Sequence, residues 1–539
     1  MTAKKILFDD IAFKALLSGI NSVSKTVSCT LGPVGRNVVL ERKFQTPQIC
    51  SDGVSIAKEI DLLDPFENMG AQLVKIAAVK TNELVGDGTT TSIILANFMS
   101  NRGFQFVASG VDGTALKRGI NKAVNVVSEY LNSISVPVTT REQIFHVASL
   151  AAHEDAIGNL ISDSIGKVGR NGSINIEESK GMYDFIEYVE GMNFDRGFIV
   201  SDFVNNDAGT ESIIDNPYIL ITELKLTSSL DIVPVLELLY KYNVRDLVII
   251  AEDVDKDALA ALLLNSSTKK IFKTVAVRSP NIGDRRSAIM KDIAVFTNGV
   301  VVNKELGVSL KNISISHFGR AKKVIVTKNS TSIIGGFGSI ESIKSRINQI
   351  KSQIPSTTSD FDRGLLEERI SKLSGGVAVI KVGAVSEVEF RERKMRVEDA
   401  LFATKSAIEE GIVPGGSVSL IRAMPNLSPL LKDPSLSVDE RFGVQIVMEA
   451  LEVPLIHIIN NSDIYNIDGS VIVDQVKNSP FGWGFDVEKG VFCDLFNVGI
   501  VDPVKVLKIS LQNAASVASM LLTTGAALAD VKNYGEKIT

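Results

Sequence analysis

The sequence has little cysteine, histidine and tryptophan, and these shortages exclude several kinds of site. Its 539 residues include three cysteines, four histidines and one tryptophan. Cys29, Cys50 and Cys493 form no CxxC pair and no even set, so we expect no disulfide framework and infer a reducing compartment. The histidines lack the spacing of a zinc site, and no Ser, His and Asp set of a hydrolase can be assembled from the spacing.

Neither clustered positive charge nor a long hydrophobic run is present. Lys and Arg number 57 against 63 Asp and Glu, and the resulting net charge of −6 argues against nucleic-acid binding. The N-terminus meets Asp9 and Asp10 without the apolar segment of a signal peptide. The most membrane-like stretch, Ala514–Ala529, falls short of the ~20 apolar residues that a span requires, so we predict a buried core helix there and no membrane span.

The rest of the composition is that of an ordinary globular protein. A hydrophobic content of 45% and a charged content of 22% predict an ample core. A chain of this length predicts roughly three or four domains. The helical pattern breaks at about Ser135–Pro137, strands and helices alternate between Gly191 and Gly376, and a helix-rich segment begins at Pro414. This order suggests a domain inserted into a middle segment.

Hydrophobic periodicity predicts the main helices and strands. The expected helices cover Asp9–Ser28, Pro65–Leu84, Thr89–Phe98, Asp255–Ser267, Ser339–Leu373 and Val397–Glu410, and the expected strands cover Asn37–Leu40, Gln48–Cys50, Leu247–Ala251 and Val377–Ile380. Asp64 caps the second helix, with Pro65 at its first position and Glu67 at capping-box spacing. Asp52 and Gly53 form a predicted tight turn, in which Asp52 by itself is an ordinary turn residue.

The segment Gly86–Thr91 joins two of these predicted helices and has the composition of an anion site. Its two glycines let the backbone approach a ligand closely, and the helix that begins at Thr89 presents free N–H groups and three threonine hydroxyls. Asp87 adds a carboxylate, which repels phosphate unless a cation lies between them, so the pair indicates a nucleotide with Mg²⁺. A plain Gly/Thr-rich turn has the same composition and stays an alternative. No Walker-type or G-x-G-x-x-G loop is present.

Two further patterns allow more than one interpretation. The leucines of the 255–267 helix cover more than one face, which fits either core packing or an apolar stripe offered to a partner. Gly191, Gly375 and Gly411 bracket two crossings between the outer and middle segments of the chain. Such glycines absorb the backbone rotation of a hinge, and they are equally common as helix C-caps.

A series of short motifs occurs in order along the chain. The motifs are Thr30–Pro33, Gly35–Leu40, Asp52–Val54, Gly86–Thr91, Phe194–Gly197, Ala251–Val254, Gly283–Arg286, Gly375–Gly383, Val397–Leu401 and Asp502-Pro503. Together they closely resemble the group I chaperonins, the 60 kDa family of bacteria, mitochondria and plastids. The resemblance covers essentially the whole chain, from Lys5 to about Thr524.

The resemblance implies a multidomain α+β and α/β fold with three domains. A mainly helical equatorial ATPase domain would comprise residues 1–133 and 411–539, a small intermediate hinge domain residues 134–190 and 376–410, and an α/β apical domain residues 191–375. It also implies an ATP-hydrolysing chaperone that captures non-native polypeptides and encloses them in a ring cavity for folding. The implied location is the bacterial cytoplasm, with the plastid stroma as an alternative.

The family's nucleotide site can be carried over to the matching positions. The implied nucleotide-binding residues are Thr30, Leu31, Gly32, Pro33, Ser51, Asp87, Gly88, Thr89, Thr90, Thr91, Gly416 and Asp502. Asp87 would hold Mg²⁺, with K⁺ as a further candidate cation. Asp399 would position the attacking water and Asp52 would assist it, while the three glycines named above would act as hinges. Phosphoryl transfer needs such positioning more than it needs a covalent catalyst.

The resemblance also implies partners. In the family, apolar residues on two helices line the ring opening and hold non-native chains. The matching positions are Phe198, Phe203, Val233, Leu236, Leu259, Leu263 and Leu264. Binding by burial of apolar surface needs no specific hydrogen bonds, which suits varied clients. Family members assemble as heptameric rings, usually stacked in pairs, and bind a small co-chaperonin lid.

Four positions depart from the family pattern. The family's lysines near the phosphates are Val34 and Ser51 here, which removes positive charge from the site. Asp202 adds a charge to the client-binding rim, and Ile456 replaces an arginine that helps to join two rings, so a double ring is left open. These departures favour an alternative function, a divergent paralogue that acts as a binding or scaffold protein with little ATP turnover. The three retained carboxylates of the nucleotide site favour the ATP-hydrolysing chaperone.

Overall fold

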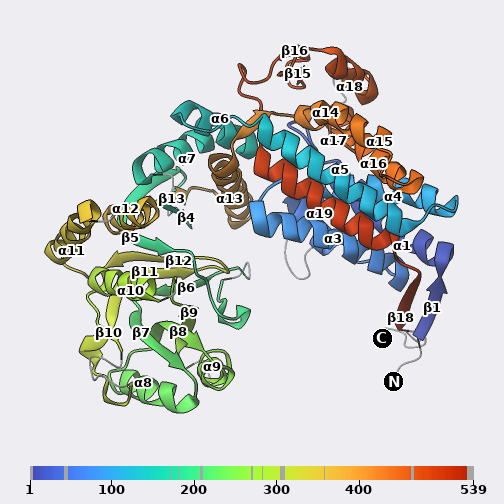
Figure 1. Cartoon of the computed structure of the whole chain (residues 1–539). Helices are drawn as coiled ribbons and strands as arrows, with labels where there is room; N and C mark the ends of the chain where they lie inside the picture. The colour runs from blue at the N-terminus through green and yellow to red at the C-terminus, as the bar shows by residue number, and fades with distance from the viewer. Residues whose placement is uncertain are drawn as a thin grey trace. The chain divides into compact units, whose positions relative to one another are not determined.

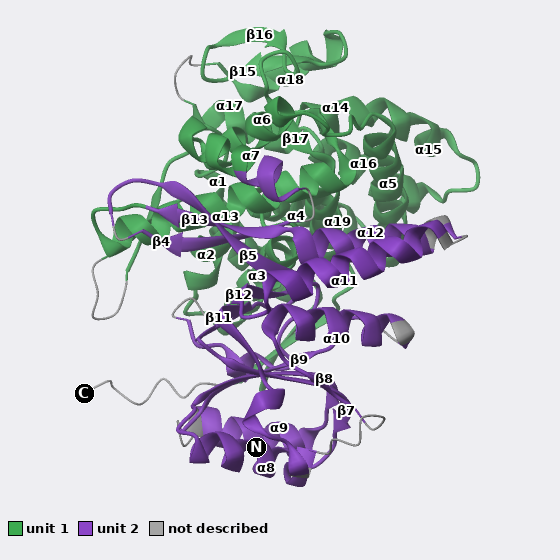
Figure 2. Ribbon diagram, turned by 90° about the vertical axis from the view of Figure 1, so that its left-hand side faces the viewer, with its two compact units in different colours: residues 1–163, 383–539 green, residues 164–382 purple. Residues whose placement is uncertain are grey.

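The computed structural model describes residues 4–41, 47–169, 172–179, 181–206, 210–268, 271–281, 283–303, 310–356, 359–462 and 467–530. The chain forms two compact units, which Figure 2 colours separately. Unit 1 combines residues 1–163 with residues 383–539, and unit 2 comprises residues 164–382. The finer division into equatorial, intermediate and apical domains stays a prediction.

Unit 1 is mainly helical (Figure 1). Its helices are α1 (Asp9–Ser28), α2 (Gly53–Glu59), α3 (Pro65–Val85), α4 (Thr89–Ala108), α5 (Gly113–Ser133), α6 (Arg141–Ala152), α7 (Asp155–Val168, whose last residues belong to unit 2), α13 (Glu387–Glu410), α14 (Val418–Ala423), α15 (Ser428–Lys432), α16 (Val438–Ala450), α17 (Val453–Asn461), α18 (Gly469–Asn478) and α19 (Val504–Leu522). Its described strands pair as antiparallel two-stranded sheets: β1 (Lys4–Phe8) with β18 (Ala526–Asp530), β2 (Val38–Leu40) with β3 (Gln48–Cys50), β14 (Ile412–Pro414) with β17 (Val501–Pro503), and β15 (Trp483–Asp486) with β16 (Val491–Asp494).

The core of unit 1 forms where long helices pack side by side. α19 lies against α3, α4 and α5, and α16 lies against α5 (Figure 1). α1 and α3 approach closely because glycines stand at their contacts. A Cβ on Gly19 would lie 1.8 Å from the Glu67 carbonyl oxygen, and a Cβ on Gly70 would lie 1.9 Å from the Leu16 carbonyl oxygen. Any larger residue at these glycines would push the two helices apart.

The start of α3 confirms most of its predicted signals. Asp64 is the N-cap, its side chain accepts hydrogen bonds from the amides of Phe66 and Glu67, and Pro65 is the first helical residue. Glu67 does not complete a capping box. Its carboxylate instead accepts a 2.8 Å hydrogen bond from the Ser18 hydroxyl of α1, so it ties α3 to its neighbour.

Unit 2 is built on a ten-stranded sheet with the order β4-β13-β5-β12-β11-β7-β8-β9, where β10 also pairs with β7 and β6 with β11. The strands are β4 (Ser173–Glu178), β5 (Phe185–Phe194), β6 (Ser212–Asp215), β7 (Tyr218–Leu226), β8 (Asp246–Val254), β9 (Lys273–Arg278), β10 (Val301–Val302), β11 (Gly319–Val326), β12 (Thr331–Gly336) and β13 (Gly376–Val382). The helices are α8 (Ser229–Lys241), α9 (Lys256–Leu263), α10 (Asp284–Thr297), α11 (Ile340–Gln353) and α12 (Asp360–Ser374). β10, β7, β8 and β9 run parallel, which confirms the predicted buried parallel strand in β8.

Short 3₁₀ turns complete the described structure. They cover Ser201–Phe203, Leu310–Asn312, Ile315–His317, Ile354–Ser356 and Met424–Leu427. The first of these carries Asp202 at an exposed position of unit 2. The fourth follows α11 directly and contains Pro355.

A buried ion-pair network joins three helices of unit 2. The Asp292 carboxylate of α10 is fully buried and accepts 2.7 Å hydrogen bonds from the Nε atoms of Arg346 on α11 and Arg369 on α12. A second nitrogen of Arg369, Nη2, donates to the same carboxylate at 3.0 Å. At the surface, the exposed pair Arg285–Asp362 also links α10 to α12, with 3.1 Å between its atoms.

Several predicted elements differ from the structure. The single helix expected over Ser339–Leu373 is two helices, α11 and α12, because Pro355 lacks a backbone donor and clashes with a continuing helix. The helix expected over Asp255–Ser267 ends as α9 at Leu263 and continues as a π-helical turn, Leu264–Thr268. The stretch expected as one helix over Ala514–Ala529 is the end of α19 followed by β18.

The tight turn expected at Asp52 and Gly53 is a helix start instead. Asp52 is the N-cap of α2, and its carboxylate accepts from the amides of Val54 at 3.2 Å and Ser55 at 2.9 Å. An aspartate followed by glycine is typical of both turns and N-caps, so the local sequence does not distinguish them. The same side chain is therefore fixed in place rather than free at a loop tip.

One stretch of the described residues is long and apolar enough to cross a membrane by length and composition. This stretch, Val438–Asn461, combines α16 and α17, and half of its most apolar window is buried inside the protein. Core helices pass the same test, so the finding is weak evidence for a span.

Candidate functional site

The N-terminus of α4 presents unpaired backbone amides, as expected of an anion site. Gly86 and Gly88 adopt left-handed conformations, with φ of 70° and 75°, and Gly88 occupies the N-cap position without a capping side chain. In the part of the chain that the structure describes, no acceptor meets the amides of Thr89, Thr90 and Thr91. The positive end of the helix dipole adds to these donors, so this helix end favours an anion.

Two other segments converge on this helix end. Thr30 Oγ1 lies 3.5 Å from Thr90 Oγ1, which brings the Thr30–Pro33 loop to α4. Gly53, at the start of α2, lies so close to α4 that a Cβ would be 2.4 Å from Thr90 Oγ1. Glycine is therefore required at this position for α2 to approach. The loop and α2 therefore both lie against the open N-terminus of α4.

Three carboxylates interact beside the same helix end. Burial raises the pKa of Asp399, on α13, well above its ordinary value, and the charges of Asp52 and Asp87 raise it further. Burial also raises the pKa of Asp87, the Gly88 amide and His153 oppose this rise, and Asp52 adds to it. Because the charges of these carboxylates oppose one another, a cation bound beside them would be favourable. The structure therefore brings together the three carboxylates that the family resemblance singled out.

The donor set fits Mg²⁺ with a nucleotide better than a metal site made of protein alone. Among the described residues, no group of three or more His, Cys, Asp or Glu side chains could hold a metal ion. Mg²⁺ keeps several water ligands and typically takes one or two carboxylates together with substrate phosphates. A single carboxylate such as Asp87 beside an anion-binding helix end meets that requirement.

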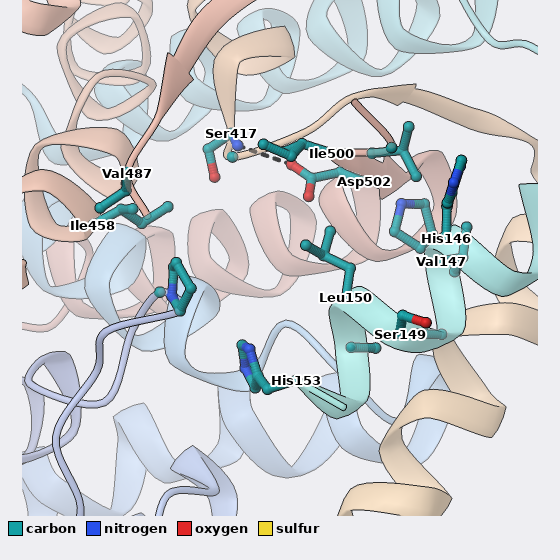
Figure 3. A pocket seen from close by; sticks show the side chains of 18 of the residues that line it. His146, Val147, Ser149, Leu150, His153, Ser417, Ile458, Val487, Ile500 and Asp502 are labelled. Atoms are coloured by element: carbon teal, nitrogen blue, oxygen red, sulfur yellow. Dashed lines mark hydrogen bonds between the residues drawn. The ribbon is translucent and has the colours of Figure 1, made fainter. Parts of the chain in front are cut away.

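A cavity of about 690 Å³ opens beside the helix end. Its wall includes eight of the predicted nucleotide-binding residues: Leu31, Gly32, Pro33, Asp87, Gly88, Thr91, Gly416 and Asp502. Figure 3 shows Ser417 and Asp502 on one side and His153 on the opposite side, with Ile458 and Val487 forming an apolar flank. The volume lies within the ~300–1,000 Å³ range of sites for small-molecule ligands.

A strand pair supports the side of the cavity remote from α4. β14 and β17 place Val413 opposite Asp502, and the chain leaving β14 turns back over the carboxylate. The Ser417 amide donates a 2.8 Å hydrogen bond to Asp502 Oδ2 (Figure 3). Burial raises the pKa of Asp502 to about 6, although the amides of Ser417 and Gly416 lower it. This carboxylate is therefore a costly group for the folded protein to keep charged.

Replacing Asp502 by asparagine is expected to stabilise the protein at pH 8. The raised pKa means that stability from proton binding is complete below about pH 4 and is lost as the pH rises through about 6. The difference amounts to at most about 3 kcal/mol at pH 8. The neutral amide avoids this loss, and its carbonyl oxygen can still accept from Ser417. Thermal unfolding should show a gain in Tm at pH 8 that disappears at pH 4, and an equal gain at both pH values would contradict the electrostatic cause.

Comparison with known proteins decides the family. The model of the TCP-1/cpn60 chaperonin family matches residues 23–232 and 239–531. The chain belongs to this family. The resemblance predicted from the sequence motifs is thereby confirmed, and the protein is a divergent chaperonin.

Solved structures confirm the chaperonin fold. The structure is similar to that of the chaperonin gp146 from the bacteriophage EL 2 (Pseudomonas aeruginosa), crystallised in the presence of ATP-BeFx. In one crystal form the TM-score is 0.70, at 20% sequence identity over 99% of each chain. In another it is 0.63, at 20% identity over 98% of this chain and 99% of that chain. This likeness confirms the predicted multidomain architecture of mixed helices and sheets.

Some predicted site residues of the chaperonin lie next to the cavity wall rather than in it. Thr30, Thr89 and Thr90 adjoin the cavity at the N-terminus of α4. Asp52 and Asp399 do not line the cavity, but their charges interact with that of Asp87, which does. Ser51 lies apart from the cavity. It is exposed next to the end of β3, and no contact among the described residues brings it to the cavity wall.

Several cavity residues were not predicted from the sequence. His146 lies on α6, His153 follows the end of α6 with a left-handed φ of 52°, and Ser417 precedes α14. Burial lowers the pKa of His153, whereas the nearby Asp87 raises it. The histidines carried no local signal because they reach the cavity only through the packing of α6. Ser417 did carry one, since it directly follows a pair of glycines.

The predicted client-binding residues are divided between the surface and the core of unit 2. Val233 on α8 is 41% exposed and Leu264 after α9 is 46% exposed. Phe203 and Leu236 are only 2% and 6% exposed, so their side chains belong to the core of unit 2. The remaining three, Phe198, Leu259 and Leu263, are partly buried against that core. Core packing therefore accounts for most of the 255–267 leucines, and a role in binding a partner stays a prediction for Leu264.

The three predicted hinge glycines have different surroundings. Gly191 lies inside β5, where a Cβ would meet Val377 Cγ2 at 2.1 Å, and Gly375 ends α12. Gly411 ends α13 with a left-handed φ of 84°, and a Cβ there would lie 2.2 Å from Ser135 Oγ. Close packing explains glycine at Gly191 and Gly411 without motion, so the hinge role stays a prediction.

Proposed function

We propose that this chaperonin binds ATP with Mg²⁺, hydrolyses it, and uses the cycle to capture non-native polypeptides and enclose them in a ring cavity for folding. The observation that carries the proposal is the meeting of three carboxylates with the open N-terminus of α4 beside a cavity large enough for a nucleotide. Phosphate-binding donors and clustered carboxylates are the two components that phosphoryl transfer requires.

Each group at the helix end has a distinct part in the proposed reaction. The amides of Thr89, Thr90 and Thr91 bind phosphate oxygens, and Asp87 holds Mg²⁺, which supplies charge neutralisation at the phosphates when it is bound. Asp399 accepts a hydrogen bond from the attacking water and so orients it, and Asp52 supports the same water from the start of α2. The absence of lysine at Val34 and Ser51 leaves the phosphate charge to backbone donors and the cation.

The apolar surface of α8 and α9 supports capture of non-native chains. Leu230 is 69% exposed, and together with Val233 and Leu264 it gives unit 2 accessible apolar surface on and beside two packed helices. Such a surface gains roughly 25 cal/mol for each Å² of apolar area buried, whatever the sequence of the client. Several weak contacts of this kind add up when subunits present them together in a ring.

Two small sheets of unit 1 support self-association. β1 and β18 place Ile6 opposite Leu528, and β2 and β3 place Val39 opposite Ile49, and all four side chains are exposed. Two-stranded sheets are marginal alone, and their open edges pair readily with other strands. Pairing between neighbouring subunits would bury these residues in a heptameric ring, on which a small co-chaperonin lid would act.

A second candidate function is a binding or scaffold protein with little ATP turnover. Val34 and Ile456, where the family has charged residues, pack against one apolar cluster of unit 1 that contains Leu455 and Ile458. Apolar packing in place of charge near the phosphates would weaken nucleotide binding, and at Ile456 it would remove an ion pair between rings. These observations favour a single ring, or free subunits, over a double ring.

The two functions are separated by measuring steady-state ATP hydrolysis and molar mass in one buffer. We expect Mg²⁺-dependent turnover that falls at least tenfold when EDTA is added, and light scattering should report about 400 kDa for a ring of seven 58.1 kDa subunits. A folded protein that is monomeric, or that binds ATP without turnover, would support the scaffold function instead. Circular dichroism of the same sample verifies that the protein is folded.

A further inference from the structure

Ser417 adopts a backbone conformation that is uncommon for serine. It lies between β14 and α14 with φ of 61° and ψ of 10°, directly after Gly416 with φ of 62°. This is the left-handed region, where the Cβ of an L-residue crowds the backbone. A non-glycine residue keeps such a conformation only where its surroundings hold it, and these residues cluster at ligand sites.

The Asp502 carboxylate holds this strained backbone. Its Oδ2 accepts the Ser417 amide at 2.8 Å, and β14 pairs with β17 immediately before the turn. Glycine would satisfy the same hydrogen bond without strain, because only the backbone amide takes part. The hydrogen bond therefore explains the shape of the turn but does not explain why a serine stands in it.

The side chain of Ser417 is directed into the cavity. The residue is 6% exposed and lines the cavity wall, and Figure 3 shows its hydroxyl pointing inward beside Asp502. Among the described residues, no hydrogen-bond partner meets this hydroxyl. A hydroxyl that faces the cavity without a protein partner is free to form a hydrogen bond with a ligand bound there.

We propose that the Ser417 hydroxyl hydrogen-bonds a sugar hydroxyl of the bound nucleotide, beside the Asp502 carboxylate, and so favours ribonucleotides over deoxyribonucleotides. The inference rests on the proposed binding of ATP. A hydroxyl that both donates and accepts, next to a carboxylate that accepts, complements the adjacent hydroxyls of a ribose. The apolar side chains of Ile458 and Val487 on the neighbouring flank suit a nucleobase.

Two variants separate the hydroxyl from the backbone. Ser417→Gly removes the hydroxyl and relieves the strain, whereas Ser417→Ala removes the hydroxyl and keeps the strain. We expect both to weaken ATP binding about three- to tenfold, as measured by titration calorimetry of the full chain. Ser417→Gly should also raise Tm by about 1–3 °C, which Ser417→Ala should not. A residue with only a structural role would move Tm without changing the affinity for ATP.

Deoxynucleotides identify the contact. The wild type should bind ATP more tightly than 2′-deoxy-ATP or 3′-deoxy-ATP, and both variants should lose this preference for the hydroxyl that Ser417 contacts. Variants that bind ATP as tightly as the wild type, or that keep the full preference, would overturn the inference while ATP binding itself stands. A wild type that binds no ATP would overturn the proposed function as well, so the two failures are distinguishable.

Discussion

Replacing Asp399 by alanine is expected to lower the turnover number of ATP hydrolysis at least about 100-fold, while ATP still binds. Asp399 lies on α13, and its charge interacts with those of Asp52 and Asp87 beside the N-terminus of α4. Removing it takes away the acceptor that orients the attacking water. It also removes a negative charge near the phosphates, so the affinity for ATP should stay equal or rise. The measurement is kcat and KM for hydrolysis, together with calorimetric ATP binding.

A matched control lies on the same helix. Glu387 is exposed at the start of α13 and pairs with Arg391. Glu387→Gln removes a charge from α13 without touching the cavity, so kcat should change less than about twofold. If the Asp399 variant keeps turnover within threefold of the wild type, hydrolysis does not depend on this carboxylate and the assignment fails.

The largest effect on stability is expected at Asp292. Asp292→Ala should destabilise unit 2 by about 3–5 kcal/mol, because two largely buried arginines would then face one another without their counterion. A melting curve of a protein with two units shows a change in stability but does not show which unit is affected. Hydrogen exchange followed by mass spectrometry resolves it, since peptides from α10, α11 and α12 should exchange faster while peptides of unit 1 are unchanged.

The surface pair between the same helices provides the control. Asp362→Ala breaks the exposed Arg285–Asp362 pair that links α10 to α12, and its expected cost is below about 1 kcal/mol. Equal losses in the two variants would mean that burial of the Asp292 network is not what makes it costly to break.

Local signals in the sequence predicted the elements around the site well. α1 spans the predicted residues, Asp64 and Pro65 begin α3, and α4 begins at Thr89. Each of these depends on neighbouring residues alone: a repeating apolar face, a capping side chain, or a proline at the first turn. The open amides of α4 follow directly from Gly88 at the cap, so this uncapped helix start was predictable from the residues themselves.

The assembly of the site was not predictable from local signals. Asp52 caps α2, Asp87 lies in the turn between α3 and α4, and Asp399 lies on α13. No spacing rule joins them; only the family resemblance did. Ser417 and Asp502 are 85 residues apart and meet because β14 pairs with β17. The end of α11 is a different case, because Pro355 marks it in the sequence while the charge-rich helical pattern continues on both sides.

Unit 1 is built from both ends of the chain, as the pairing of β1 with β18 illustrates, and this affects the synthesis of the chain. α1 to α5 leave the ribosome long before α16 and α19, the helices that complete their core. Unit 2 is continuous in sequence, so it can fold as soon as residue 382 has emerged. Until α19 arrives, the apolar faces of α3, α4 and α5 stay open to water, and a half-made subunit is prone to aggregation. A newly made chaperonin subunit is thus itself a chain that needs protection.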